Sequence, residues 1–185
     1  MALKEFISTF NRYGVGKKYN FQVTDITNDP AGIFKDHSDL LLYVETLVLP
    51  SIKVHTTTVP YKAFDFTVPT NVSFPDSNRW KVTFYSDDNL IIRQLFENWS
   101  GFIYDFENNY SNPKNYTKRT DTNKNWGDSI LKLQLNNDAD QKIKTYSLYG
   151  VFPVLIENIE YSISDTGETV AKVPVTLAFQ YFTQD

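Results

Sequence analysis

The residue types that most often carry acid–base or metal chemistry are scarce in this chain. It contains two histidines, His37 and His55, and no cysteine. His37 lies in a polar segment and His55 in a threonine-rich one, and neither has a pattern of carboxylates beside it. A zinc site needs further nitrogen or sulfur ligands, and a calcium site needs a cluster of carboxylates. Asp25, Asn28 and Asp29 lack the spacing and the closing glutamate of a calcium loop, so they predict a turn.

Glycine-rich phosphate loops are also missing from the sequence. The seven glycines form neither the G-x-x-x-x-G-K-[ST] nor the G-x-G-x-x-G pattern. A Ser–His–Asp triad is assembled only in space and so stays open, but no nucleophile motif supports one. We therefore predict a protein that is not an enzyme, with no cofactor and no metal ion.

One segment combines basic and aromatic side chains, as many single-stranded nucleic-acid sites do. Its members are Lys114, Lys118, Arg119 and Lys124, with Tyr110, Tyr116 and Trp126 nearby. Asp121 and Asp128 dilute the positive charge, and the whole chain carries a net charge of −4. The segment falls in a polar stretch, 107–127, whose length and composition predict a long loop. We favour a solvated loop or a protein contact over a nucleic-acid site.

The bulk composition indicates a single domain, residues 1–185, with an unusual share of aromatic rings. Aromatic residues make up 16% of the chain, and strands favour them. No apolar run reaches the roughly 18–20 residues that cross a bilayer, so we predict no membrane contact. Residues 1–10 carry Glu5 and lack a long apolar core, unlike a signal peptide. We expect the protein to be made in the cytoplasm and used there or built into a particle.

Alternating apolar and polar residues predict that most of the chain forms β-strands. The clearest strand contains Trp80, Val82 and Phe84 on one face. Further strands are predicted at 19–24, 40–49, 131–136, 142–149, 154–162 and 171–181, and the apolar residues on both faces of 40–49 indicate deep burial. Pro174 predicts a bulge or a sheet edge because proline cannot donate to a ladder. Turns are predicted at 137–140 and 165–167.

Helical spacing appears at two places. Leu3, Phe6, Ile7 and Phe10 predict a short amphipathic helix in the first ten residues, which Gly14 and Gly16 then break. A second run, from Leu90 to Ile103, predicts the one main helix, at about 88–99. Asp87 or Asp88 is expected to cap it, and Gly101 to end it.

Residues 52–68 differ from the other strands because they show no clear core face. Two β-like runs lie around Pro60 and Tyr61, and the stretch is rich in threonine and valine. Such a hairpin either leaves the body and packs on a neighbouring subunit, or is an ordinary exposed hairpin. Under the first interpretation the inter-subunit residues are Ile52, Val54, Thr56, Thr57, Thr58, Val59, Tyr61, Phe64 and Phe66.

Together these elements predict a mainly β fold. Seven to nine strands and one helix are typical of an antiparallel β-sandwich or barrel with one packed α-helix. The segment 52–68 is then a long protruding hairpin, and 107–127 a polar loop.

The order of these features resembles the tail tube proteins of contractile-tailed bacteriophages (myophages). The resemblance runs from about residue 19 to residue 182. Six segments carry it: Leu49–Pro50 before the arm, Val59–Pro60 within it, Trp80–Phe84 before the helix, Phe96–Trp99 at the end of the helix, the corner Tyr149–Pro153 and the closing strand Val173–Phe182. The stretch 107–127 has no counterpart that we can match.

This resemblance implies both a fold and a role. Such proteins form hexameric rings that stack into the inner tail tube, through which DNA passes into the host. Each subunit gives strands to a continuous inner barrel, and the hairpin arm contacts the adjacent ring. The implied partners are further copies of the chain, the tail sheath, the baseplate and tail terminator proteins, and, transiently in the lumen, the tape measure protein and DNA. The implied location is the virion, assembled in the host cytoplasm.

Two other classes of protein remain open. A tube-initiating or tube-terminating protein, or the tube subunit of a contractile injection system, would share the fold, and an initiator or terminator would form single rings. A monomeric β-barrel that binds a ligand would share the strand pattern but would not assemble.

Overall fold

The computed structural model describes residues 20–27, 32–74, 78–107, 110–111, 128–137, 139–161 and 170–185. Its elements are β1 (Phe21–Thr27), the 3₁₀ helix η1 (Ser38–Tyr43), β2 (Val44–Leu47), β3 (Lys53–Tyr61), β4 (Phe64–Ser73), β5 (Arg79–Tyr85), α3 (Ile91–Ile103), β6 (Tyr104–Asp105), β7 (Tyr110–Ser111), β8 (Ile130–Asn136), β9 (Lys142–Tyr149), β10 (Phe152–Ile156), β11 (Lys172–Ala178) and β12 (Tyr181–Gln184).

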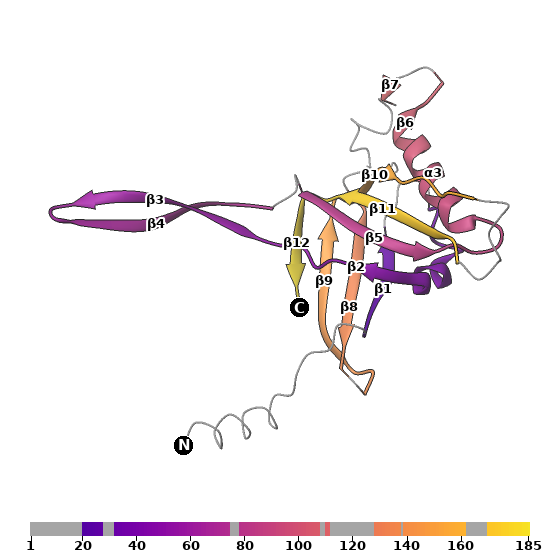
Figure 1. Ribbon diagram of the computed structural model, residues 1–185, viewed down its shortest axis with the longest axis horizontal. Helices are drawn as coiled ribbons and strands as arrows, with labels where there is room; N and C mark the ends of the chain where they lie inside the picture. Colours follow the sequence, from indigo (N-terminus) through magenta and orange to yellow (C-terminus); the bar gives the residue numbers. More distant parts are fainter. Residues whose placement is uncertain are drawn as a thin grey trace.

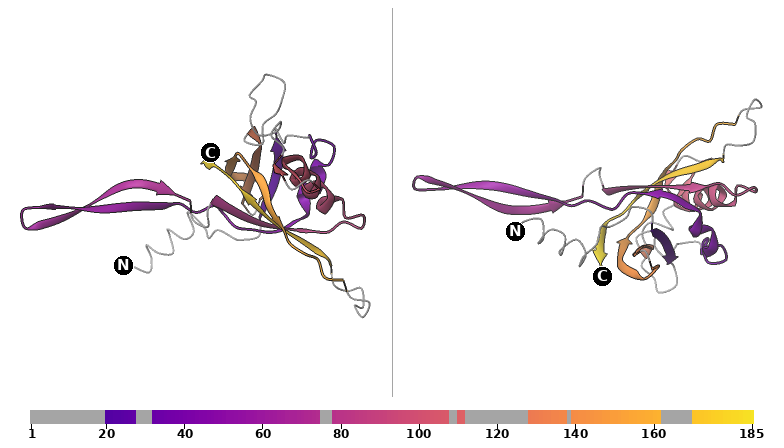
Figure 2. Two further views of the ribbon diagram at one scale, coloured as in Figure 1. Left: turned by 90° about the horizontal axis from the view of Figure 1, so that it is seen from above. Right: turned by 60° about the horizontal axis from the view of Figure 1, so that its bottom comes forward.

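Two antiparallel four-stranded sheets form the body (Figure 1). The first, which we call sheet A, has the order β1-β8-β9-β12, and the second, sheet B, has the order β10-β11-β5-β2. Their inward faces share one core, so the predicted mainly β sandwich with one main helix is confirmed. The strands β3 and β4 form a separate two-stranded sheet that extends away from this body (Figures 1 and 2).

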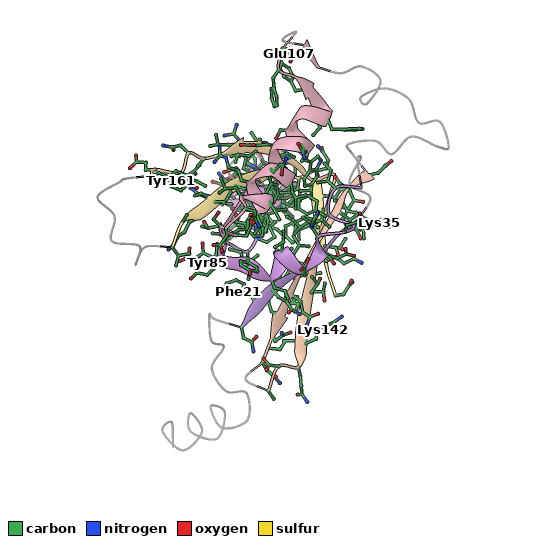
Figure 3. All side chains as sticks on the ribbon, turned by 90° about the vertical axis from the view of Figure 1, so that its right-hand side faces the viewer. Phe21, Lys35, Tyr85, Glu107, Lys142 and Tyr161 are labelled. Atoms are coloured by element: carbon green, nitrogen blue, oxygen red, sulfur yellow. The ribbon has the colours of Figure 1, made fainter. Side chains whose placement is uncertain are left out.

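The alternation in β5 and β11 shows why these residues form the core. Val173, Val175 and Leu177 lie opposite Phe84, Val82 and Trp80, and every one of these six side chains is buried. Since side chains opposite each other in an antiparallel pair share a face, both strands turn one apolar face inward. Leu131, Leu133 and Leu148 face them from sheet A. Figure 3 shows the side chains filling the space between the sheets and α3.

The helix α3 covers the remaining side of the core. Its buried residues Ile92, Leu95, Phe96 and Trp99 recur at helical spacing. Phe96 lies 5.4 Å from Phe84 and 5.3 Å from Phe34, measured between ring centroids.

The limits of α3 differ from the prediction at both ends. The helix starts at Ile91 because Leu90 has a left-handed φ of 56°. Of the two residues predicted to cap the helix, Asp87 does so. Its carboxylate accepts hydrogen bonds from the backbone amides of Asn89, Ile91 and Ile92 at 3.0–3.1 Å. The predicted end at Gly101 is wrong, since the helix continues to Ile103. A Cβ at Gly101 would lie 3.6 Å from the ring of Phe106, an ordinary van der Waals contact, so no close approach requires a glycine at this position.

The predicted buried strand at 40–49 is also wrong. The segment starts in η1 and only Val44–Leu47 is strand. Within η1, Leu41 is buried but Leu42 is 67% exposed, because a 3₁₀ turn directs consecutive side chains to different sides. A run of apolar residues alone does not distinguish these two structures.

Pro174, the strand at 154–162 and the closing run depart from expectation. Pro174 lies in β11, which is an interior strand and pairs with β5 without a register shift, so there is neither a bulge opposite β5 nor a sheet edge. The carbonyl of Pro174 accepts the amide of Glu157, just beyond the end of β10. The proline nitrogen, which has no hydrogen to donate, therefore lies where the neighbouring strand has ended. The strand predicted at 154–162 starts earlier, at Phe152, so that it contains Pro153, and it ends at Ile156. The predicted run 171–181 divides after Ala178, and β12 joins the other sheet.

One predicted turn and the number of strands can be compared with the structure, whereas several other predicted segments cannot. The turn at 137–140 is confirmed, since the amide of Asp140 donates to the carbonyl of Asn137 at 3.0 Å. The described part of the chain contains twelve strands, more than the seven to nine predicted, because β2, β6, β7 and β12 are short. The first ten residues, Asn28 and Asp29, the turn 165–167 and most of 107–127 lie outside the described residues, although Tyr110–Ser111 pairs there with β6.

Candidate assembly interface

The two histidines occupy separate places in the fold. His37 precedes η1, and His55 lies in β3, where its Nε2 is 2.7 Å from the Oγ of Ser73. Among the described residues, no three His, Cys, Asp or Glu side chains are grouped so that they could hold a metal ion. The unusual surface of the molecule is instead apolar, and it lies on the hairpin.

The hairpin β3–β4 has no layer packed against either face among the described residues. Every side chain from Lys53 to Val72 is exposed except the half-buried His55. Pairing runs from Lys53 opposite Ser73 to Tyr61 opposite Phe64, so the turn is formed by Lys62 and Ala63. Lys62 has a φ of 56°, and Pro60 lies within a strand rather than at the turn. We call this hairpin the arm.

The arm is fixed to the body at both of its legs. On the first leg, the indole N–H of Trp80 donates to the carbonyl of Val48. On the second leg, the ring of Phe74 lies 5.5 Å from Phe179 and 5.4 Å from Phe182. Because Phe179 is itself a core residue, the arm is anchored where the two sheets meet.

One face of the outer half of the arm is apolar. The register places Val59 opposite Phe66, Tyr61 opposite Phe64 and Thr57 opposite Val68, so these side chains share a face. We call the apolar members, Val59, Tyr61, Phe64, Phe66 and Val68, the distal stripe. Their exposed fractions range from 36% for Val68 to 71% for Phe64. The rings of Tyr61 and Phe66 lie 6.2 Å apart, which makes the stripe continuous across the strands.

The opposite face of the outer arm is polar or carries proline. It presents Thr56, Thr58, Pro60, Asp65, Thr67 and Pro69. The arm is therefore amphipathic in the manner of a strand pair with one buried face, although the described residues supply no layer to bury it. A contiguous exposed apolar surface of this kind marks an interaction site.

A β-bulge changes the pattern near the base of the arm. The register shifts between His55 and Thr56, where Thr70 is the extra residue and its Oγ1 donates to the carbonyl of His55 at 3.1 Å. Beyond the bulge Val54 lies opposite Val72, on the face of the ribbon away from the stripe. Both valines are exposed.

The structure thus divides the nine residues named from the sequence. Thr57, Val59, Tyr61, Phe64 and Phe66 lie on the stripe face, Val54, Thr56 and Thr58 lie on the other face, and Ile52 precedes β3. Two residues of the apolar surface were missed, Val68 and Val72. Val68 continues the alternation of Phe64 and Phe66, so its signal was present in the sequence. Val72 was hidden because the bulge reverses its face.

The outward faces of both sheets carry polar side chains that take part in ion pairs. In sheet A, Lys132 and Gln134 alternate with the buried Leu131 and Leu133, and Lys132 lies 3.8 Å from Asp25. In sheet B, ion pairs join Lys81 to Glu157 and Lys172 to Glu45. The paired carboxylate of Glu45 raises the pKa of Lys172.

The edges of the two sheets differ. Within the described residues β1 and β12 have no further strand beside them. The edge strand β10 of sheet B is accompanied by α3, and Arg93 Nη1 donates to the carbonyl of Glu157 at 2.9 Å. Sheet A therefore offers two strand edges that run antiparallel to each other.

A sandwich with a rooted, exposed amphipathic arm and open strand edges is typical of a structural protein that assembles. The sequence model of the phage tail tube protein family matches residues 6–185. The chain therefore belongs to the phage tail tube protein family, which confirms the resemblance seen in its motifs.

Solved structures of contractile systems share the fold. A chain of the PVC sheath/tube terminator of an extracellular contractile injection system, in its extended state, matches with a TM-score of 0.52 and 12% identity over 77% of this chain and 84% of that chain. The anti-feeding prophage cap, a tube terminating cap, matches with a TM-score of 0.53 and 10% identity over 92% of this chain and 91% of that chain. At these identities the likeness concerns the fold alone.

No curated protein sequence matches the chain. Among the described residues, no helix has both the length and the apolar character needed to cross a membrane.

Proposed function

We propose that this protein is the subunit of a phage tail tube, in which copies join into hexameric rings and the rings stack through their arms. The observation that carries this proposal is the distal stripe, an apolar face on a rooted arm with nothing to cover it among the described residues. Covering such a face with another copy removes apolar surface from water, at about 25 cal/mol per Å². A head-to-tail contact that never closes gives a filament, and a tube is a filament of rings.

Ring closure is supported by sheet A. Its four strands alternate in direction, so β12 of one copy meets β1 of the next in the antiparallel sense. Repeating this contact around a ring gives a closed barrel, which has no exposed strand edges. The outward face of sheet A then lines the channel. Lys132 beside Asp25 leaves little net positive charge on it, so passing DNA gains few phosphate contacts.

In this role the protein acts through its shape and performs no catalysis. The further partners are the sheath outside the tube, the baseplate and the terminator at its ends, and the tape measure protein and DNA within it. The family supports a place in the phage tail, and the fold shared with a sheath/tube terminator and a tube terminating cap is consistent with these partners. Assembly takes place in the host cytoplasm.

Electron microscopy of the purified protein at increasing concentration tests the proposal. The expected result is extended tubes with six-fold cross-sections. Phe66→Asp places a charge on the distal stripe and is expected to prevent stacking, whereas Thr67→Asp, on the opposite face of the same strand, leaves it intact.

The other outcomes are equally informative. A chain that stays monomeric even with a sheath or baseplate present contradicts the proposal and favours the monomeric binding protein. Single rings that never stack favour a tube initiator or terminator. Tubes formed equally well by Phe66→Asp show that the arm is not the stacking contact.

A further inference from the structure

A second apolar surface lies at one end of the sandwich, away from the distal stripe. It is a groove of about 920 Å³ between the start of β1, the end of β8 and the segment that contains β2. Its lining is mainly apolar and includes Phe21, Leu135, Leu47, Val48 and Tyr85. Figure 3 labels Phe21 and Tyr85, which lie toward the same lower part of the body. We call this surface the end groove.

The end groove is where the core stays open. Phe21 lies opposite Leu135, and both have the parity of the buried residues Val23 and Leu133, yet they are only half-buried. Val48 is 63% exposed and forms part of the wall. These apolar side chains lie on the core side of the sheet, but no described layer covers them. They therefore stay partly in contact with water, unlike the other residues on that face.

The described chain begins at this groove. Asn20, which is one of the lining residues, is held in place by three hydrogen bonds. Its side-chain amide donates to the carbonyl of Asn137 and, at 3.0 Å, to Oδ1 of Asp140, while its carbonyl accepts the amide of Asn136 at 3.0 Å. Asn20, the residue that follows segment 1–19 in the sequence, is therefore fixed on the rim of the groove.

The chain before that point has the length and pattern to fill the groove. Leu3, Phe6, Ile7 and Phe10 repeat at i, i+3, i+4 and i+7, the spacing of one apolar helical face. A ten-residue helix is about 15 Å long. Residues 11–19 span up to about 30 Å when extended, and Gly14 and Gly16 permit the chain to reverse direction.

We propose that the amphipathic segment 3–10 folds back into the end groove of its own subunit and closes the open end of the core. The tether favours the subunit's own groove over that of a neighbour. A short flexible linker holds its ligand at an effective concentration of about 1 mM, which exceeds that of separate subunits at about 10 µM roughly a hundredfold. The arm of the same copy is not a competing occupant, because it extends away from the body (Figure 2).

The natural lack of cysteine provides a direct test. Single cysteines are placed in turn at Phe6, Ser8 and Thr9, each combined with Val48→Cys in the end groove. The matched control combines the same cysteines with Leu155→Cys, which lines the groove between α3 and β10 and is 52% exposed, close to the 63% of Val48. Because a disulfide needs Cα atoms within about 7 Å, only a docked segment brings the pair together.

In dilute, unassembled protein we expect at least one Val48→Cys pair to form a disulfide within one chain about a hundredfold faster than its Leu155→Cys control. Disulfides that join two chains, or equal rates in both sets, overturn the proposal. As a second measurement, the double variant Phe6→Asp, Phe10→Asp is expected to raise the fluorescence of an apolar dye severalfold by uncovering the groove. An unchanged signal also counts against it. Neither readout depends on whether tubes form, so this proposal and the proposed function fail separately.

Discussion

Two strand pairs of this protein show the same alternation of apolar and other residues, but one pair is buried and the other is exposed. In β5 and β11, Trp80, Val82 and Phe84 and their partners are at most 2% exposed. In β3 and β4, Val59 and Phe66 also share one face, but they are 46% and 53% exposed. The difference is that sheet A lies over the first pair, while no described element lies over the second.

An apolar strand face and the layer that covers it are therefore separate requirements. Alternation with a period of two predicts which face of a strand is apolar, and it predicts such a face for both pairs. The covering layer comes from the same chain for β5 and β11. For the arm no described residue of the same chain supplies it, and under the proposed function another copy does. The same residue types would then serve folding in one region and assembly in the other.

The largest effect is expected from removing a ring in the covered pair. Phe84→Ala should lower the free energy of unfolding by about 3–5 kcal/mol, because it leaves a cavity among Phe96 and the facing strands. The measurement is urea unfolding of unassembled protein. The matched substitution Phe66→Ala on the arm should change it by less than about 0.5 kcal/mol. A similar loss at both sites would mean that the arm is packed within its own subunit.

The arm should show the reverse preference when assembly is measured. Tyr61→Ala removes a ring from the distal stripe and should cost about 2 kcal/mol at a buried contact, which raises the concentration needed for tube formation roughly 30-fold. Sedimentation of tubes over a concentration series gives this value. Thr58→Ala, on the other face of the same strand, is the control. If the two substitutions weaken assembly equally, the stripe is not the contacting face.

A substitution at the cap of α3 tests whether local hydrogen bonds stabilise the body in addition to the packing of its sheets. Asp87→Ala removes the acceptor of the amides of Asn89, Ile91 and Ile92 and should lower the free energy of unfolding by about 1 kcal/mol. Asp88→Ala, at the exposed neighbouring position, should have little effect on the same urea curve. Equal losses would assign the cap to both residues. Tube formation by folded Asp87→Ala should be unchanged, since the cap lies away from the arm.

The smallest effect concerns pH. Burial favours the neutral form of Asp87, but the amide hydrogen bonds from Ile91, Ile92 and Asn89 outweigh it and lower the pKa of this carboxyl below its ordinary 3.8. A lowered pKa adds stability in full above pH 3.8, and that stability is lost as the pH falls through the folded-state value. Urea unfolding between pH 5 and about 2.5 should therefore decline less steeply for Asp87→Asn than for the natural chain. Parallel curves would show that other carboxyls control this range.

Much of the body was predictable because its signals are local. The alternation around Trp80 and around Val173 located β5 and β11, and the helical spacing of Leu95, Phe96 and Trp99 located α3. The limits of these elements were predicted less well. The helix continues through Gly101 to Ile103, and the closing run divides after Ala178, where β12 goes on to pair with β9 of the other sheet. Which sheet a strand joins depends on pairing with residues far away in the sequence, and a local pattern does not specify that pairing.

Read alone, the amino-acid sequence shows the alternation of the strands and the scarcity of histidine and cysteine. The expectation that 52–68 has no clear apolar face was wrong for its outer half, because the pairing of β3 with β4 gathers Val59, Phe66 and Val68 on one side. In particular, the bulge at Thr70 sets Val72 beside Val54 instead of beside Phe66 and Val68. The physical reason is that side-chain direction along one strand follows from backbone geometry, whereas a shared face across two strands depends on register, which forms only when the strands pair.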